Sequence, residues 1–130
     1  MSGPLAADLE RVLRSTDATA RAHLADLNQP QLHVATRGDG PLLVVAGPGA
    51  GKTRAIVARA AHLVLARCVS PRQIMAITFS RRAAGELQTR LATVLAQTGA
   101  IWAGTFHGLG ARILRRGGAA HFHRPQSFTI

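Results

Sequence analysis

The sequence predicts an α/β fold with a parallel sheet, and this class follows from two observations. Apolar runs typical of buried strands, at residues 42–46, 74–79 and 101–105, alternate with amphipathic patterns typical of helices. A glycine-rich segment, residues 47–51, separates the first run from the first of these helices. Strands that alternate with helices favour right-handed βαβ units and parallel pairing. With 130 residues, of which 47% are hydrophobic, the chain has room for one domain with a modest core.

The charge balance is strongly basic, with 16 Lys and Arg against 6 Asp and Glu and a formal net charge of +10. Such an excess favours a polyanionic partner, and an arginine-rich, alanine-rich compositional bias remains as the alternative explanation. The lone cysteine, Cys68, excludes an internal disulfide and fits a reducing compartment. No uncharged apolar run has the length of a membrane span, and the acidic residues Asp8 and Glu10 are atypical of a secretory signal. We therefore expect a cytoplasmic protein without a membrane partner.

The expected elements fall into two parts of the chain. Residues 1–26 are expected to form a helical N-terminal extension, in which acidic side chains such as Asp26 are most simply a solvated face. Residues 27–130 are expected to hold the sheet and its helices. The expected helices are at 4–14, from about 15 to 27, and then at 30–38, 52–66, 81–97 and 108–116, and the expected strands are at 42–46, 74–79, 101–105 and 128–130. The helix at 52–66 is expected to bury Ile56, Ala60, Leu63 and Val64.

The glycine-rich segment has the features of a phosphate-binding loop. Glycine lets the backbone turn its N–H groups inward around a phosphate without a Cβ clash, and the following helix adds its dipole. The pattern G-x-x-x-x-G-K-[ST] is matched in relaxed form, because Ala46 holds its first position. Lys52, the only lysine of the chain, would contact the β- and γ-phosphates, and the Thr53 hydroxyl would ligate Mg²⁺. An ordinary glycine turn between a strand and a helix is the alternative.

Three segments are expected to meet beyond the carboxyl ends of the strands, where parallel sheets bind ligands. They are the glycine-rich segment, residues 78–82 and residues 104–108. Phe79 and Phe106 occupy matching strand-exit positions beside a cationic surface. The two rings suit either base stacking, which contributes about 1–3 kcal/mol per base, or core packing.

Two pairs of arginines lie at helix ends. Arg81 and Arg82 fall in a first turn, where the macrodipole disfavours a cation by about 0.3–1 kcal/mol, and a bound anion would offset that cost. Arg115 and Arg116 fall in a last turn, where the dipole favours cations. Dipole compensation is therefore the simpler interpretation of the second pair.

Four segments together resemble the UvrD/Rep/PcrA-like superfamily 1 DNA helicases. They are LNxxQ at 27–31, AGPGAGKTR at 46–54, ITFSRRAA at 77–84 and GTFHGLGARILRR at 104–116, in the order and spacing of that family. The resemblance covers residues 27–130. It implies a three-layer P-loop NTPase sheet of the RecA-like type, here incomplete and ending near the point where the family inserts its helical DNA-binding subdomain.

The resemblance also implies roles for individual residues. Gln31 would recognise adenine, Arg54 would lie near the nucleotide, and Thr53 would hold Mg²⁺ through the nucleotide. The residues expected to bind ATP are Gln31, Ala46, Gly47, Pro48, Gly49, Ala50, Gly51, Lys52, Thr53 and Arg54. Those expected to contact single-stranded DNA are Phe79, Ser80, Arg81, Arg82, Phe106 and His107.

The chain departs from the family pattern at several positions. Arg81 and Arg82 stand where the family usually has Asn-Lys, which keeps a cation and loses an amide. Gly108 replaces a serine that could bond phosphate, and Pro48 and Ala50 stiffen the loop and remove a hydroxyl.

The family's carboxylates that bind Mg²⁺ and activate water have no counterpart in these residues. Downstream of the loop the only carboxylate is Glu86, inside an expected helix. Positioning and charge neutralisation are nearly the whole of phosphoryl-transfer catalysis, so we expect ATP to bind and not to be hydrolysed by this chain alone. As a complete polypeptide the chain is expected to be marginally stable, aggregation-prone or oligomeric.

The favoured function is therefore the N-terminal ATP-binding portion of a UvrD-like helicase, with ATP and Mg²⁺ as cofactors and single-stranded DNA as partner. A basic, non-enzymatic module that coats DNA or regulates an intact helicase is the alternative. A small P-loop kinase is the weakest hypothesis, because it also needs carboxylates at strand ends. Further expected partners are an intact helicase or another copy of the chain.

Overall fold

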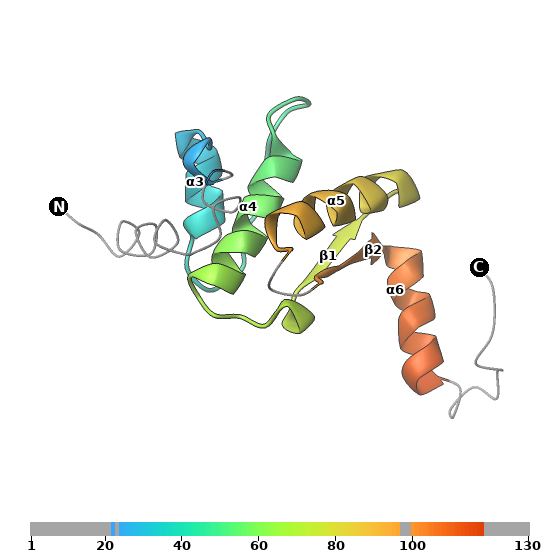
Figure 1. The fold of residues 1–130 in the computed structure, drawn as a ribbon. Coiled ribbons are helices and arrows are strands. Elements are labelled where there is room, and N and C mark those ends of the chain that lie inside the picture. The colour runs from blue at the N-terminus through green and yellow to red at the C-terminus, as the bar shows by residue number, and fades with distance from the viewer. Residues whose placement is uncertain (1–21, 23, 97–99, 119–130) are drawn as a thin grey trace.

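The computed structural model describes residues 22, 24–96 and 100–118. Its helices and strands follow one another as in Figure 1: α3 (Gln29–Thr36), α4 (Lys52–Leu65), the 3₁₀ helix η1 (Pro71–Gln73), β1 (Met75–Thr78), α5 (Arg81–Val94), β2 (Trp102–Thr105), α6 (Phe106–Ile113) and the π-helical turn η2 (Leu114–Gly118). The expected helix at 4–14, most of the second expected helix and the expected strand at 128–130 lie outside the described residues.

A single βαβ unit forms the sheet. β1 and β2 pair in parallel, from Met75 beside Trp102 to Thr78 beside Thr105, and α5 connects them. Parallel strands need such a crossover, since a tight hairpin joins only antiparallel neighbours. The predicted α/β class with a parallel sheet is confirmed, with two strands in the part of the chain that the structure describes.

The expected strand at residues 42–46 is wrong. No strand forms in this segment, and Leu43 and Val45 are 87% and 89% exposed. A strand exists only through hydrogen bonds to a neighbour. Within the described ranges β1 and β2 pair with each other alone, so the segment has no partner. The glycine loop, residues 47–51, consequently follows a largely exposed segment and not a strand of the sheet.

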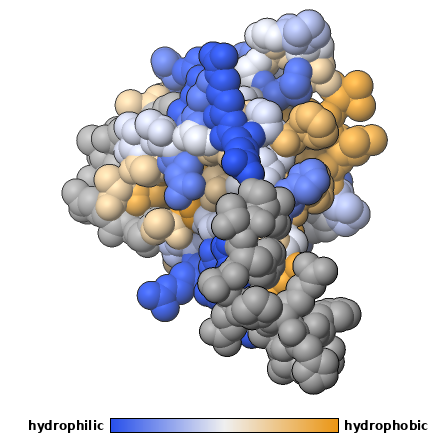
Figure 2. Space-filling view, turned by 90° about the vertical axis from the view of Figure 1, so that its right-hand side faces the viewer, coloured by the Kyte–Doolittle hydropathy of each residue, from blue (hydrophilic) through white to orange (hydrophobic). Residues whose placement is uncertain are grey.

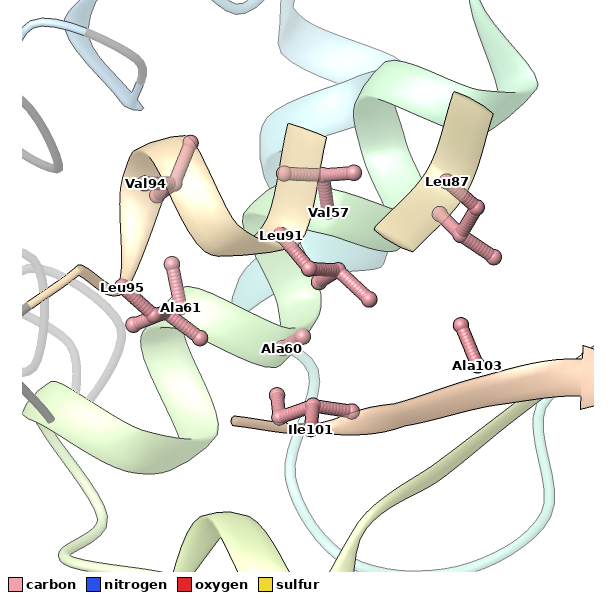
Figure 3. Close-up of a cluster of buried hydrophobic side chains, with 9 residues drawn as sticks. All are labelled: Val57, Ala60, Ala61, Leu87, Leu91, Val94, Leu95, Ile101 and Ala103. Carbon is pink, nitrogen blue, oxygen red and sulfur yellow. The ribbon is translucent and has the colours of Figure 1, made fainter. Parts of the chain in front are cut away.

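The main core lies between α4, α5 and one face of β2 (Figure 3). It is built from Val57, Ala60 and Ala61 of α4, Leu87, Leu91 and Val94 of α5, and Leu95, Ile101 and Ala103. The buried stripe of α4 differs from the expected one: Ala60 is buried and Leu63 and Val64 are half-buried, but Ile56 is 48% exposed. Both α3 and α5 contact α4, and the buried positions of α4 are Ala55, Val57, Ala58, Ala60, Ala61 and His62.

A second cluster fixes α3 against α4. Leu24, Ala35, Ala58 and Ala66 are buried together, with Leu27 packed against them. The Arg59 guanidinium of α4 donates to the carbonyl oxygens of Val34 (2.9 Å) and Arg37 (3.0 Å), which satisfies acceptors at the C-terminal end of α3. This packing places the start of α3 beside the glycine loop.

None of the helices that the structure describes is long and apolar enough to cross a membrane.

Candidate functional site

The glycine loop turns the chain into the first residue of α4. Gly49 and Gly51 have positive φ values of 75° and 78°, in the left-handed region that glycine adopts without strain. Gly51 is the N-cap of α4, and it provides no side-chain hydrogen bond to the helix. No acidic residue occupies the first turn. The N–H groups of that turn are therefore available to an anion, which the helix dipole would also attract.

Lys52 lies across this loop. Its Nζ atom donates to the carbonyl oxygens of Ala46 (3.1 Å) and Gly47 (2.6 Å). Both acceptors are neutral, and among residues 24–96 and 100–118 the ammonium makes no ion pair with a carboxylate. A phosphate oxygen would offer this ammonium a charged acceptor, and such hydrogen bonds are shorter and about twice as strong as neutral ones.

Gln31 connects α3 to the loop. Its Oε1 atom accepts from the backbone N–H of Asn28 (3.2 Å), in a capping box that starts α3. Its Nε2 atom donates to the carbonyl oxygen of Ala50 (3.2 Å). A Cβ atom added at Gly51 would collide with the end of the Gln31 side chain, and the positive φ of Gly51 also favours glycine there. The sequence predicts both residues as nucleotide contacts, and the structure places them side by side.

A cavity of about 290 Å³ lies between α3 and the loop. Its lining combines apolar side chains with the Gln31 amide and Lys52, and consists of Asn28, Pro30, Gln31, Val34, Val44, Val45, Ala46, Ala50, Gly51, Lys52 and Ala55. Small-molecule sites are typically apolar clefts of this size range with a few polar groups that orient the ligand. A flat base against the valines, with an amide at its edge, fits this lining.

The residues expected to hold the metal and flank the nucleotide lie at the start of α4. Thr53 is exposed in the first turn, and a hydroxyl oxygen is the kind of ligand that Mg²⁺ takes beside substrate phosphates. The Arg54 guanidinium instead donates to the Asp26 carboxylate at 2.9 Å. Asp26 is 79% exposed, as expected for a solvated face, but it also holds the chain before α3 against α4. Sequence reasoning missed this pair, because nothing in the local pattern links two residues that far apart in the chain.

Phe79 and Phe106 occupy equivalent places at the end of the sheet. Each follows one member of the Thr78–Thr105 pair, where both strands end and α5 and α6 begin (Figure 1). Their side chains are 94% and 69% exposed, which excludes core packing for both. The side of the molecule toward which the strands point is seen in Figure 2, where hydrophilic surface lies beside a hydrophobic area.

Hydroxyl groups cap both helices that start at this strand-exit edge. Ser80 Oγ accepts from the backbone N–H of Ala83 (3.1 Å), and Thr105 Oγ1 accepts from that of Gly108 (3.1 Å). The Thr105 cap was missed from the sequence, and it explains why α6 begins at Phe106, before the predicted start at 108. The Ser80 hydroxyl is thus already engaged in its helix.

The cationic side chains of the edge are exposed. Arg82 Nε pairs with Glu86 Oε1 at 3.1 Å, one helical turn later, so a carboxylate of α5 itself offsets part of the dipole cost at this arginine. The bound anion expected at this helix start is therefore not required to explain Arg82. Arg81 and His107 are also exposed, each in the first turn of its helix.

The predicted site residues therefore form two groups. Gln31, Ala46, Ala50, Gly51 and Lys52 line one cavity. The strand-exit residues gather at the end of the sheet, and none of them lines that cavity. The expected meeting of all three segments at one sheet edge is not found, because the segment before the loop is not a strand of the sheet.

Comparison with known proteins places this arrangement in a family. The model of the UvrD/REP helicase N-terminal domain matches residues 27–130. The chain is 47% identical over 106 residues to the ATP-dependent DNA helicase PcrA of Leuconostoc citreum, which covers 80% of this chain and 14% of that protein. It is 45% identical over 95 residues to the PcrA helicase of Bacillus subtilis (strain 168), covering 72% and 13%. It is 42% identical over 110 residues to DNA helicase II of Escherichia coli (strain K12), covering 82% and 15%.

The chain thus spans 13% to 15% of the length of these three relatives. All of the segments that carried the resemblance, from residue 27 to residue 116, lie inside the matched range. The chain belongs to the UvrD/REP helicase N-terminal domain family.

Proposed function

We propose that the chain is the N-terminal ATP-binding portion of a UvrD-like ATP-dependent DNA helicase and that it also contacts single-stranded DNA. The observation that carries the proposal is the cavity shared by Gln31, the loop and Lys52, next to a helix start without a side-chain cap. One wall of this site is apolar and the other is cationic. A purine nucleoside triphosphate has an apolar base that fits the first wall and an anionic triphosphate that fits the second.

Each group of the site has a distinct task in binding. Val34, Val44 and Val45 would flank the base, and the Gln31 amide would hydrogen-bond its edge after leaving the Ala50 carbonyl. Lys52 would exchange two neutral carbonyl acceptors for phosphate oxygens. Magnesium, held by the nucleotide and the Thr53 hydroxyl, would supply neutralisation of the phosphate charge.

Replacing Gln31 by alanine is expected to remove most of the preference for ATP over GTP, because only a directed amide distinguishes the edges of the two purines. A site that loses one hydrogen bond to a neutral group loses about 0.5–1.5 kcal/mol, or roughly 2- to 12-fold in affinity. Titration of both nucleotides by calorimetry measures the ratio. Gln29→Ala, an exposed glutamine of the same helix, is the matched control and should leave the ratio unchanged. Equal affinity for GTP in the unmodified chain would remove the adenine-reading role.

We expect no ATP turnover by the chain of residues 1–130 on its own. Hydrolysis needs a carboxylate that positions magnesium and water, and the one carboxylate downstream of the loop, Glu86, pairs with Arg82 on α5. Release of inorganic phosphate from ATP, with and without single-stranded DNA, measures turnover. DNA-stimulated release that disappears in Lys52→Ala would refute the expectation.

The exposed phenylalanines favour a second candidate, a non-enzymatic module that binds single-stranded DNA and regulates an intact helicase or another copy of itself. DNA binding alone would explain why these rings are exposed and why the net charge is +10, without any role for a nucleotide. The two candidates differ in one measurable respect. DNA affinity that is sensitive to salt and indifferent to ATP supports the module, whereas ATPase activity that appears with the remaining helicase segments supports the ATP-binding portion.

A further inference from the structure

A basic hollow surrounds Trp102, the only tryptophan of the chain. Two neighbouring cavities, of about 350 Å³ and 400 Å³, share Trp102, Arg112 and Arg116. We call them together the Trp102 pocket. Its other lining residues are Pro71, Arg72, Ile74, Met75, Ala100, Gly108 and Arg115. None of the residues assigned above to nucleotide binding, and neither Phe79 nor Phe106, belongs to this lining.

The alternation of β2 creates the pocket. Ala103 faces the core with α5, so Trp102 and Gly104 lie on the opposite face of the strand. The indole ring lies over Gly104, where a Cβ atom would collide with it. α6 then runs back from the end of β2 and places the Arg112 guanidinium over the ring, at 5.5 Å from its centroid. Stacking on an aromatic face fixes a guanidinium that would otherwise be mobile.

Three arginines from separate elements line the cavity beside this ring. Arg72 comes from η1, Arg112 from α6 and Arg116 from η2. Within the residues that the structure describes, none of the three makes an ion pair with a carboxylate. Helix-dipole compensation accounts for a cation at the end of α6, whereas Arg72 belongs to the three-residue 3₁₀ helix η1, which has few aligned peptide dipoles. Like charges gathered without counter-charges favour an anionic ligand.

We propose that the Trp102 pocket binds a backbone phosphate of a nucleic acid strand, as a second contact separate from the strand-exit edge. The inference rests on the proposed contact with single-stranded DNA. Phe106 and Arg112 stand at the two ends of α6, about 9 Å apart along its axis at about 1.5 Å per residue. That length corresponds to roughly three stacked nucleotides at about 3.4 Å each. A strand stacked on Phe106 that follows α6 therefore brings a later phosphate to the three guanidinium groups.

Trp102 makes the test direct, because the chain has one tryptophan and no tyrosine, so the tryptophan emission reports on this pocket alone. We expect oligothymidylates longer than a few nucleotides to change the Trp102 fluorescence, and mononucleotides and inorganic phosphate to have little effect. The double variant Arg72→Gln, Arg116→Gln leaves the Arg112–Trp102 stack in place. It should lower the slope of log affinity against log salt by about 1 for each phosphate that is no longer neutralised. Arg90→Gln, an exposed arginine of α5 outside the pocket, is the matched control and should retain the full slope.

The outcomes separate this inference from the proposed function. If Phe106→Ala weakens binding while the double variant and the Trp102 emission behave as in the unmodified protein, the pocket inference is overturned and the DNA contact stands. If inorganic phosphate alone saturates the fluorescence change and oligonucleotides do not, the pocket holds a free anion and the inference fails. If no oligonucleotide binds to any variant, both fail. Far-UV circular dichroism of each variant shows whether it folds, and a misfolded double variant is replaced by the single variants Arg72→Gln and Arg116→Gln.

Discussion

Replacing Lys52 by alanine is expected to weaken Mg·ATP binding by about 10- to 100-fold. Hydrogen bonds that involve a charged group contribute about 1.5–3 kcal/mol, and 1.4 kcal/mol corresponds to a tenfold change in affinity. Lys52 is the only side-chain cation that lines the cavity beside the loop, and its present acceptors are two neutral carbonyl groups. Anisotropy of a fluorescent ATP analogue measures the loss directly.

The stability of the Lys52→Ala variant should stay close to that of the unmodified protein. The lysine is exposed and bonds only to the carbonyl groups of its own loop, and such surface substitutions are usually within about 0.5 kcal/mol. Lys52→Arg is the second informative variant, because it keeps the charge and replaces a compact ammonium by a planar guanidinium. Unchanged ATP affinity in both variants would mean that the loop is an ordinary turn.

The helices and strands that depend on local signals were predicted closely from the sequence. The helix predicted to start at Arg81 does so, because the Ser80 hydroxyl caps it by accepting from the backbone N–H of Ala83. The helix predicted from Lys52 to about residue 66 ends at Leu65, and the strand predicted at 74–79 is β1 at 75–78. Caps, glycine breaks and hydrophobic periodicity act over a few residues, so the sequence contains them in full.

The features that depend on distant partners were not predicted. Residues 42–46 have the apolar, β-branched composition of a buried strand, but a strand also needs a hydrogen-bonded neighbour, and none pairs with them among the described residues. The Asp26–Arg54 ion pair and the contact of Gln31 with Ala50 join segments that only the packing of α3 on α4 brings together. Lys52 could be singled out from composition, because it is the only lysine of the chain. The position of the Trp102 ring over Gly104 could not be predicted in this way, because it depends on which residues of β2 face away from the core.

Replacing Phe79 and Phe106 together by alanine is expected to weaken binding of single-stranded DNA by at least about 30-fold. Base–aromatic stacking contributes about 1–3 kcal/mol per base, and two rings at matched positions of adjacent strands can each hold one base. Each single variant should lose about fivefold or more, and the two losses in free energy should add if the rings hold separate bases. Anisotropy of a labelled oligothymidylate at fixed salt measures each affinity, with Ile56→Ala as a control for the removal of an exposed apolar side chain from another surface.

The same variants also test what the rings do for the fold. Because Phe79 and Phe106 are 94% and 69% exposed, their removal should change the free energy of unfolding by no more than about 0.5 kcal/mol each. A buried phenylalanine would cost about 3–5 kcal/mol when cut to alanine. A large loss of stability with unchanged DNA affinity would show that the rings serve packing, and it would remove the strand-exit edge from the DNA-binding surface. Lost affinity with unchanged stability is the expected result, since a side chain that faces solvent in the free protein can contribute its stacking energy only when a base covers it.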